Sequence, residues 1–170
     1  PMRCLRLALT TASLSLAAAP VAAADMTITV DIPRISTAGY HRPYVAIWIE
    51  QPDQTALRTL SVWYETNAQR GTASGASYLK DLRTWWRKGG RSFDLPADGI
   101  SGATRAPGRQ TVTIPAARLN SLPAGQYNVV IEAARELGGR ELVRVPIRWG
   151  GPTATATATA TGSTELGAIR

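Results

Sequence analysis

The residues best suited to chemistry lie in one short stretch that has little apolar content. Its sequence is DGISGAT, from Asp98 to Thr104, and it combines two hydroxyl groups with one carboxylate. A hydroxyl group is a weak nucleophile until a base takes its proton. Gly102 and Ala103 leave space for another molecule to approach the backbone closely. The stretch therefore predicts either a modified hydroxyl or a surface turn that the side chains of Asp98 and Ser101 hold.

The remaining reactive side chains are too few for the common catalytic arrangements. The sequence has one histidine, His41, and one cysteine, Cys4, so it lacks the ligand pairs of a typical zinc site. A hydrolase would have to join His41 with Asp98, and no G-x-S-x-G motif supports that arrangement. Asp94 and Asp98 are four residues apart, which alone does not pair two carboxylates for glycoside hydrolysis. We therefore expect no metal site and no hydrolase.

The D-x-x-S-G-A-T pattern closely resembles the acceptor motif of bacterial FAD:protein FMN transferases. In that family of modified proteins, the phosphate of FMN is joined to the hydroxyl of the final threonine by a phosphoester bond. The resemblance implies a covalent FMN on Thr104. It also implies that Asp98, Ser101, Gly102 and Ala103 form the sequence around the attachment point that the transferase recognises.

A second, partial copy of the pattern shows why the aspartate matters. Ser74-Gly75-Ala76-Ser77 repeats the S-G-A-S/T core, but Gly71 stands where the motif requires aspartate. Ser77 lies directly before a helical pattern, and serine is a favoured residue at a helix N-terminus. We therefore interpret the second copy as a helix start and the complete motif as the flavin attachment site.

A further resemblance covers most of the chain after residue 24. The segments RPYVAIWIEQ, YLKDLRTWWRK, DGISGATRAPG and GQYNVVIEAARE are similar to the bacterial periplasmic family named domain of unknown function 2271. That family tends to occur alongside PepSY-type membrane reductases and the FMN transferase. The resemblance implies periplasmic redox work without an established reaction. Together with the flavin motif, it leads us to expect an electron carrier more than an enzyme, which takes electrons from a membrane reductase.

Aromatic and basic residues near the motif suit a bound flavin. An isoalloxazine ring needs a flat apolar or aromatic platform, and Trp85 and Trp86 are candidates for it. Arg105 follows Thr104 directly and could neutralise the FMN phosphate. The alternative for these residues is that Trp86 is a core residue and the arginines are solvated. The alternative function is a cofactor-free periplasmic binding or assembly module, with the Trp-rich helix as its partner surface.

The first residues of the chain have the pattern of a secretory signal. Arg3 and Arg6 precede an apolar run at residues 7–19, and an A-x-A cleavage pattern ends at Ala24. The run is too short to span a bilayer. We expect a signal peptide at residues 1–24, removed after Ala24, and a periplasmic mature chain without a transmembrane segment.

The charge of the chain argues against nucleic acid as a partner. The formal net charge is +7 at pH 7, and loss of Arg3 and Arg6 with the signal lowers it from +7 to +5. The remaining basic residues are scattered and form no run of five. Such a field favours acidic partners or ligands that carry phosphate.

The elements that must position the motif are mostly strands. Apolar and polar residues alternate in six segments, and a helical period appears only around residues 77–90. The expected strands are 26–32, 42–51, 56–65, 110–116, 122–136 and 142–149. These patterns predict an all-β fold over residues 25–150, an immunoglobulin-like antiparallel β-sandwich with one short amphipathic helix inserted.

Finer predictions concern the faces and ends of these elements. Leu60, Val62 and Tyr64 alternate on the third strand, and Pro146 indicates an edge strand or a bulge. The helix is expected to have about three turns, with Ser77 at its start and Trp86 on its inner face. Residues 91–109 show no period and are expected to form a loop, and the threonine- and alanine-rich residues 151–170 a disordered tail.

Overall fold

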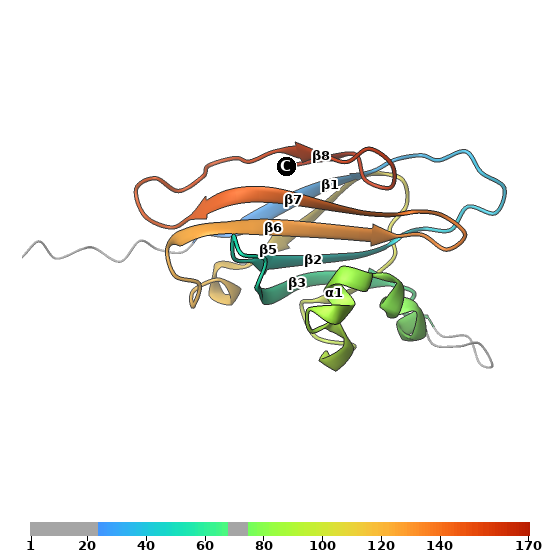
Figure 1. The fold of residues 1–170 in the computed structure, drawn as a ribbon, viewed down its shortest axis with the longest axis horizontal. Coiled ribbons are helices and arrows are strands. Elements are labelled where there is room, and N and C mark those ends of the chain that lie inside the picture. The colour runs from blue at the N-terminus through green and yellow to red at the C-terminus, as the bar shows by residue number, and fades with distance from the viewer. Residues whose placement is uncertain (1–23, 68–74) are drawn as a thin grey trace, which may run out of the picture.

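Alternating apolar residues build the strands of two sheets that pack face to face (Figure 1). The computed structural model describes residues 24–67 and 75–170. The five-stranded sheet has the order β4-β3-β2-β6-β7, and the four-stranded sheet has the order β5-β1-β9-β8. The strands are β1 (Met26–Ile32), β2 (Tyr44–Glu50), β3 (Ala56–Tyr64), β4 (Ser101–Ala103), β5 (Gly108–Ile114), β6 (Gly125–Ala134), β7 (Arg140–Trp149), β8 (Ala160–Thr161) and β9 (Ala168–Ile169).

The strand order follows the immunoglobulin arrangement. In one sheet β7, β6, β2 and β3 occupy the positions of strands G, F, C and C′, and in the other β5 and β1 occupy those of E and B. The Tyr127 hydroxyl, near the start of β6, donates a hydrogen bond of 2.8 Å to the carbonyl of Pro123, as in the tyrosine corner of such folds. The predicted all-β sandwich with a short helix is confirmed, and β7, which carries Pro146, is an edge strand as expected.

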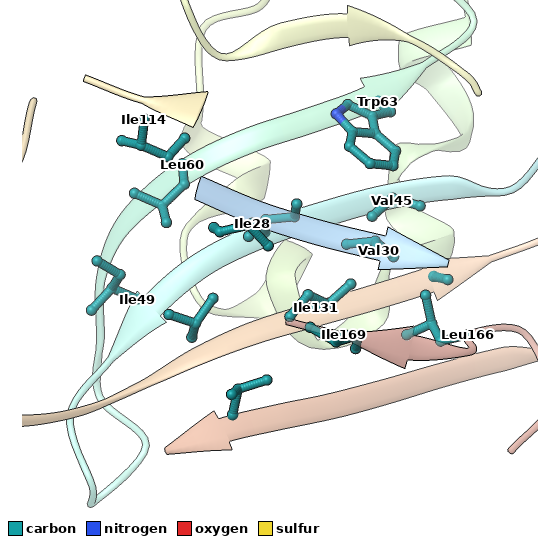
Figure 2. Packing of buried hydrophobic residues seen from close by; sticks show 14 of the residues in the cluster. Ile28, Val30, Val45, Ile49, Leu60, Trp63, Ile114, Ile131, Leu166 and Ile169 are labelled. Atoms are coloured by element: carbon teal, nitrogen blue, oxygen red, sulfur yellow. The ribbon is translucent and has the colours of Figure 1, made fainter. Parts of the chain in front are cut away.

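The core between the sheets is formed by one face of each long strand (Figure 2). Val45, Ile47 and Ile49 of β2 point into it, opposite Ile28 and Val30 of β1. Each fully buried side chain of this size contributes about 1.5–3 kcal/mol relative to its exposed state. This layer therefore supplies most of the apolar burial that holds the two sheets together.

The other face of the five-stranded sheet is covered by the helical segment, residues 75–92. Figure 1 shows this segment beside β3, away from β1 and β8. Ala46 and Trp48 of β2 point toward it and pack in a second apolar cluster with Leu79 and Leu82. Because β2 is buried on both faces, its sequence is apolar at nearly every position.

A bulge in β3 changes the face of one predicted residue. Ile47 pairs with Ser61 and Trp48 pairs with Thr59, so Leu60 is the extra residue between the two pairs. Leu60 therefore points into the core between the sheets, whereas Val62 and Tyr64 point to the opposite cluster. The prediction that these three side chains share one face is wrong for Leu60.

The helical segment is shorter and less regular than the sequence predicts. A 3₁₀ helix at Gly75–Asp81 leads into the five-residue α1 (Arg83–Arg87), and a second 3₁₀ turn follows at Gly90–Ser92. Ser77 does not cap α1, whose N-terminal residue is preceded by Leu82. Trp85, 2% exposed, takes the inner position predicted for Trp86, which is only partly buried. No helix within the described residues is long and apolar enough to cross a membrane.

The predicted disordered tail is wrong for the end of the chain. β9 pairs with β1, β8 pairs with β9, and both strands lie in the four-stranded sheet. Leu166 and Ile169 are buried in the core between the sheets (Figure 2). These two large apolar residues follow the threonine- and alanine-rich repeat and give the segment the apolar area that the repeat lacks. The folded domain thus extends beyond residue 150.

Polar contacts hold this C-terminal segment as well. The carboxylate of Glu141 on β7 accepts hydrogen bonds from the backbone N–H groups of residues 163–166, at 2.6–3.0 Å. Glu165 forms a buried ion pair with Arg135 at 2.9 Å. A carboxylate surrounded by successive N–H groups fixes the backbone path, so the segment has a defined course over β7.

Candidate functional site

The predicted motif forms an edge strand instead of an irregular loop. β4 pairs in parallel with the end of β3, so the sheet is not purely antiparallel. Before the strand, the Ser101 hydroxyl accepts a hydrogen bond of 2.9 Å from the Ala97 N–H. After the strand, the Thr104 N–H donates to the Tyr64 carbonyl at 3.2 Å. The backbone is thus held on both sides of the motif, with Thr104 at the point where the chain leaves the sheet.

Thr104 lies at a cleft of about 490 Å³ that is rich in tyrosine. Tyr40, Tyr44 and Tyr78 contribute to its walls, and Tyr78 is an exposed aromatic residue at 48%. The cleft also has six charged or titratable residues: His41, Arg42, Glu65, Asp81, Arg135 and Glu136. The mixture of aromatic rings and charges suits a polar ligand that has a planar ring system.

One hydroxyl at this cleft has no partner. Tyr40 Oη is buried, and it is the one such side-chain polar atom without a hydrogen bond in the described part of the chain. Burying a hydroxyl without a hydrogen bond costs free energy, and such groups in folded proteins call for an explanation. The Tyr40 ring also lies 5.7 Å from the guanidinium carbon of Arg135. The Tyr40 hydroxyl is therefore a buried donor whose hydrogen bond is not made within the described residues.

Two tyrosines of the cleft, Tyr40 and Tyr44, have raised pKa values. Burial raises the pKa of Tyr40, an effect that the positive charge of Arg135 reduces in part. Burial also raises the pKa of Tyr44. A hydrogen bond with the backbone of Glu65 lowers this pKa, but by less than burial raises it. Both phenols therefore keep their protons across the physiological range, and each has an O–H to offer.

The structure separates several residues that the sequence grouped around the flavin. Asp98 is exposed in the turn before β4 and does not line the Thr104 cleft. Arg105 stacks on Trp63, with its guanidinium carbon 4.0 Å from the ring centroid, and donates to the Thr111 carbonyl at 2.8 Å. Burial lowers the pKa of Arg105. The stacking contact with Trp63 and the hydrogen bond to the Thr111 carbonyl hold its guanidinium in place.

Trp85 and Trp86 do not line the Thr104 cleft either. The Trp85 indole N–H donates to the Thr59 hydroxyl at 3.0 Å, and its ring packs between the helical segment and the sheet. Trp86 lies beside it, with ring centroids 6.5 Å apart. The aromatic residues that line the Thr104 cleft are three tyrosines. Sequence reasoning placed Tyr78 on the aromatic helix but missed Tyr40 and Tyr44, which come from a loop and a strand far from it in the chain. The run GYHRPY offered the one available signal, two aromatic residues around a histidine and an arginine.

His41 makes a contact at the same cleft. Its Nδ1 lies 3.4 Å from Glu136 Oε2, and both side chains are largely exposed. Within residues 24–67 and 75–170 no cluster of three histidine, cysteine or acidic residues could hold a metal ion. The groups that line the cleft are the Thr104 hydroxyl, phenols and charged side chains.

Fold and site together define a two-sheet β-sandwich protein with a hydroxyl-bearing edge strand at a tyrosine-rich cleft. The chain belongs to the family described as "Predicted periplasmic protein (DUF2271)", which it matches over residues 25–168. The match includes β8 and the first residue of β9, so the C-terminal strands belong to the family domain. No curated protein and no solved structure matches the chain.

Proposed function

We propose that this protein is a periplasmic electron carrier with FMN attached covalently to Thr104. The observation that carries the proposal is the position of Thr104, at the end of β4 and at the cleft that holds the unpartnered Tyr40 hydroxyl. The complete D-x-x-S-G-A-T motif and the membership in a periplasmic family support it.

The residues of the cleft fit FMN. A flavin ring has carbonyl and nitrogen acceptors, and the Tyr40 hydroxyl is a buried donor without an acceptor. Tyr78 offers an exposed aromatic face, and Arg42 a positive charge at the same cleft. When bound, FMN supplies one- and two-electron redox chemistry. The residues of this chain then orient the ring and limit the access of water.

We assign the attachment step to the transferase, because a threonine hydroxyl is a weak nucleophile until a base activates it. In the proposed reaction Thr104 Oγ1 bonds to the FMN phosphorus of FAD, the pyrophosphate bond breaks, and AMP leaves. The hydroxyl proton passes to a base of the transferase. Ala103 is exposed and Gly102 is half-exposed, so the strand edge presents little bulk to that enzyme.

Export and partners are part of the same proposal. The family match starts at residue 25, which is the first residue after the expected cleavage site. The expected signal peptide falls on residues 1–24, of which 1–23 lie outside the described residues. The proposed partners are the FAD:protein FMN transferase and a PepSY-type membrane reductase that donates the electrons.

The alternative is a cofactor-free module that binds partners through its Trp-rich helix. In the structure this helix exposes less aromatic surface than the sequence suggests. Trp85 is buried against the sheet, so a partner at this helix would meet Tyr78 and part of Trp86. We therefore keep the flavin carrier as the proposed function.

Intact mass spectrometry tests the proposal. The chain is exported from a host that contains the transferase, and we expect its mass to exceed that of the mature polypeptide by one FMN residue. The yellow colour should survive denaturation. The Thr104→Val variant should lose both signals, and the matched variant Thr113→Val, at an exposed threonine of β5, should keep them. Absence of the adduct, or its persistence in Thr104→Val, would show that the proposal is wrong.

A further inference from the structure

A second cleft lies on the other side of the motif, and nothing in the proposed function uses it. It has a volume of about 510 Å³. Trp85 and Phe93 form aromatic parts of its lining, Ile100 of the motif turn adds an apolar part, and Arg58 and Arg118 add two guanidinium groups. Thr104 does not line it. The two clefts are therefore separate sites around the same short strand.

The charge of this second cleft is entirely positive. None of its lining residues is acidic, and the cations are Arg58, Lys88 and Arg118. Lys88 pairs with Glu50, from which it is 3.1 Å away. For Arg58 and Arg118, the described part of the chain offers no carboxylate within the 4.0 Å of an ion pair.

Both arginines are oriented by neutral acceptors. Arg118 donates to the carbonyls of Gly99 at 2.7 Å and Leu60 at 3.0 Å. Arg58 donates to the Arg118 carbonyl and, at 2.6 Å, to the Ser121 hydroxyl. These contacts fix the guanidinium groups but leave their charges uncompensated. A fixed, uncompensated pair of guanidinium groups is preorganised for a carboxylate or phosphate.

The two charges also act on each other. Burial lowers the pKa of Arg118, and the positive charge of Arg58 lowers it further. The repulsion between two nearby cations is relieved when an anion binds between them. This cleft therefore favours an anionic ligand over a neutral one.

The aromatic lining specifies the rest of the ligand. The rings of Trp85 and Phe93 have centroids 6.4 Å apart and are tilted by 48°, and Leu57 at the cleft is an exposed apolar residue. Aromatic side chains prefer offset or edge-to-face contacts with another ring. An occupant with a planar ring and a single acidic group would use both parts of the cleft.

We propose that this cleft binds a small aromatic carboxylate, with the carboxylate at Arg58 and Arg118 and the ring at Phe93 and Leu57, next to the largely buried Trp85. The site is independent of the flavin, because it involves other residues and needs no modification of Thr104. It touches the motif only through Gly99 and Ile100. Binding there would stiffen the turn that leads into β4.

Calorimetric titration of the unmodified, full-length exported chain with 2-naphthoate tests this assignment. We expect saturable binding at one site and quenching of tryptophan fluorescence by the ligand. Acetate, which lacks the ring, and 2-naphthalenemethanol, which lacks the charge, should each bind at least about tenfold more weakly. Equal affinity for naphthoate and acetate would show that the aromatic lining has no role, and absence of saturable binding would overturn the proposal.

Variants locate the binding site. Arg118→Gln should weaken naphthoate binding by about tenfold, as expected for the loss of one charge-assisted contact. Arg91→Gln, at an exposed arginine of the same side of the sheet, is the matched control. Phe93→Leu removes a ring without touching the arginines and should also weaken binding, which keeps the proposal testable if Arg118→Gln does not fold. Thr104→Val should bind normally, and loss of binding in that variant would assign the ligand to the other cleft.

Discussion

The two faces of the five-stranded sheet are held in different ways. On the face toward β1, apolar side chains such as Ile47 and Ile131 pack against the second sheet, and the buried ion pair Arg135–Glu165 lies beyond the end of β6. On the face toward the helical segment, Glu50 and Glu132 are fully buried beside the aromatic residues. The first face is a conventional core, whereas the second combines apolar burial with two carboxylates.

Each buried carboxylate fixes a part of the helical segment. Glu132 accepts hydrogen bonds from the N–H groups of Thr84 and Trp85, at 3.0 and 2.8 Å, and pairs with Arg140. Glu50 pairs with Lys88 and with Arg144, at 3.1 and 2.6 Å.

Burial raises the pKa of Glu50, but these two cations outweigh it and leave the pKa lowered. The difference between the faces shows that apolar contacts hold the two sheets together, whereas buried charges orient the helical segment. Because Trp85 and Lys88 of that segment line one of the two clefts, the buried carboxylates also position part of its wall.

The largest expected effect is on the apolar face. Ile131→Ala removes most of a fully buried side chain from the middle of β6 and leaves a cavity between the sheets. Such substitutions lower the free energy of unfolding by about 2–5 kcal/mol. Denaturant unfolding measures the change. Thr113→Ala on exposed β5 is the control and should stay within about 0.5 kcal/mol of the unmodified chain. An equally small effect of Ile131→Ala would mean that this face is not the main core.

The next residue of the same strand tests the other face. Glu132→Ala leaves two N–H groups of α1 without acceptors and Arg140 without its ion pair, so we expect a loss of about 3 kcal/mol. In contrast to Ile131→Ala, it should also change the near-ultraviolet circular dichroism of Trp85 while the sheets remain folded. Asp81→Ala, at an exposed carboxylate of the 3₁₀ helix, is the control. Loss of both sheets together with the helix would remove the distinction between the faces.

These two residues also show what could be predicted from the sequence. Ile131 lies in an alternating run, alternation predicted the long strands, and Pro146 pointed to the edge position of β7. The alternation of apolar and polar residues shows which face of a strand is buried. Since burial on one face is what defines the strands of a sandwich, these strands could be predicted. Glu132 interrupts an apolar run, and nothing in the local sequence indicates that its carboxylate receives the N-terminus of a helix 47 residues away.

The same limit explains the errors around the site. Trp86 was predicted to be inside because a regular helix was assumed, but the 3₁₀ segment shifts the inner position to Trp85. The motif itself could be recognised from sequence, since it is contiguous. The meeting of the three tyrosines of its cleft could not, because residues 40, 44 and 78 come together only after the strands have paired. The C-terminal strands were missed because Leu166 and Ile169 are too few to show a period.

A smaller effect is expected from pH, through the carboxylate that holds the C-terminal segment. Burial alone would raise the pKa of Glu141, but the N–H groups of Ser163, Thr164 and Leu166 outweigh it and lower the pKa from 4.5 to about 2. A lowered pKa contributes stability that is present above the ordinary value of 4.5 and is lost as the pH falls toward 2. The free energy of unfolding should therefore fall over this window.

The Glu141→Gln variant isolates that contribution. Since glutamine does not titrate, its free energy of unfolding should fall less steeply between pH 4.5 and 2 than that of the unmodified chain. Hydrogen exchange of residues 163–166 should show the same pH dependence, because their N–H groups donate to this carboxylate. Parallel pH profiles for the two proteins would mean that Glu141 does not hold the segment.

The smallest effect on stability is expected at Gly102, where the demands of the fold and of a modifying enzyme can be separated. Gly99 has a φ of +68°, a left-handed conformation that favours glycine, so Gly99→Ala should cost about 1 kcal/mol. At Gly102 an added Cβ would lie 3.6 Å from Trp63 Cδ1, an ordinary contact. Gly102→Ala should therefore have a free energy of unfolding within about 0.5 kcal/mol of that of the unmodified chain.

If a transferase grips this strand edge, the methyl group of Gly102→Ala should still lower the fraction of protein that carries FMN, measured by intact mass. Full flavinylation of Gly102→Ala would show that the small residue is not needed for access, and the motif would then depend on Asp98 and Thr104.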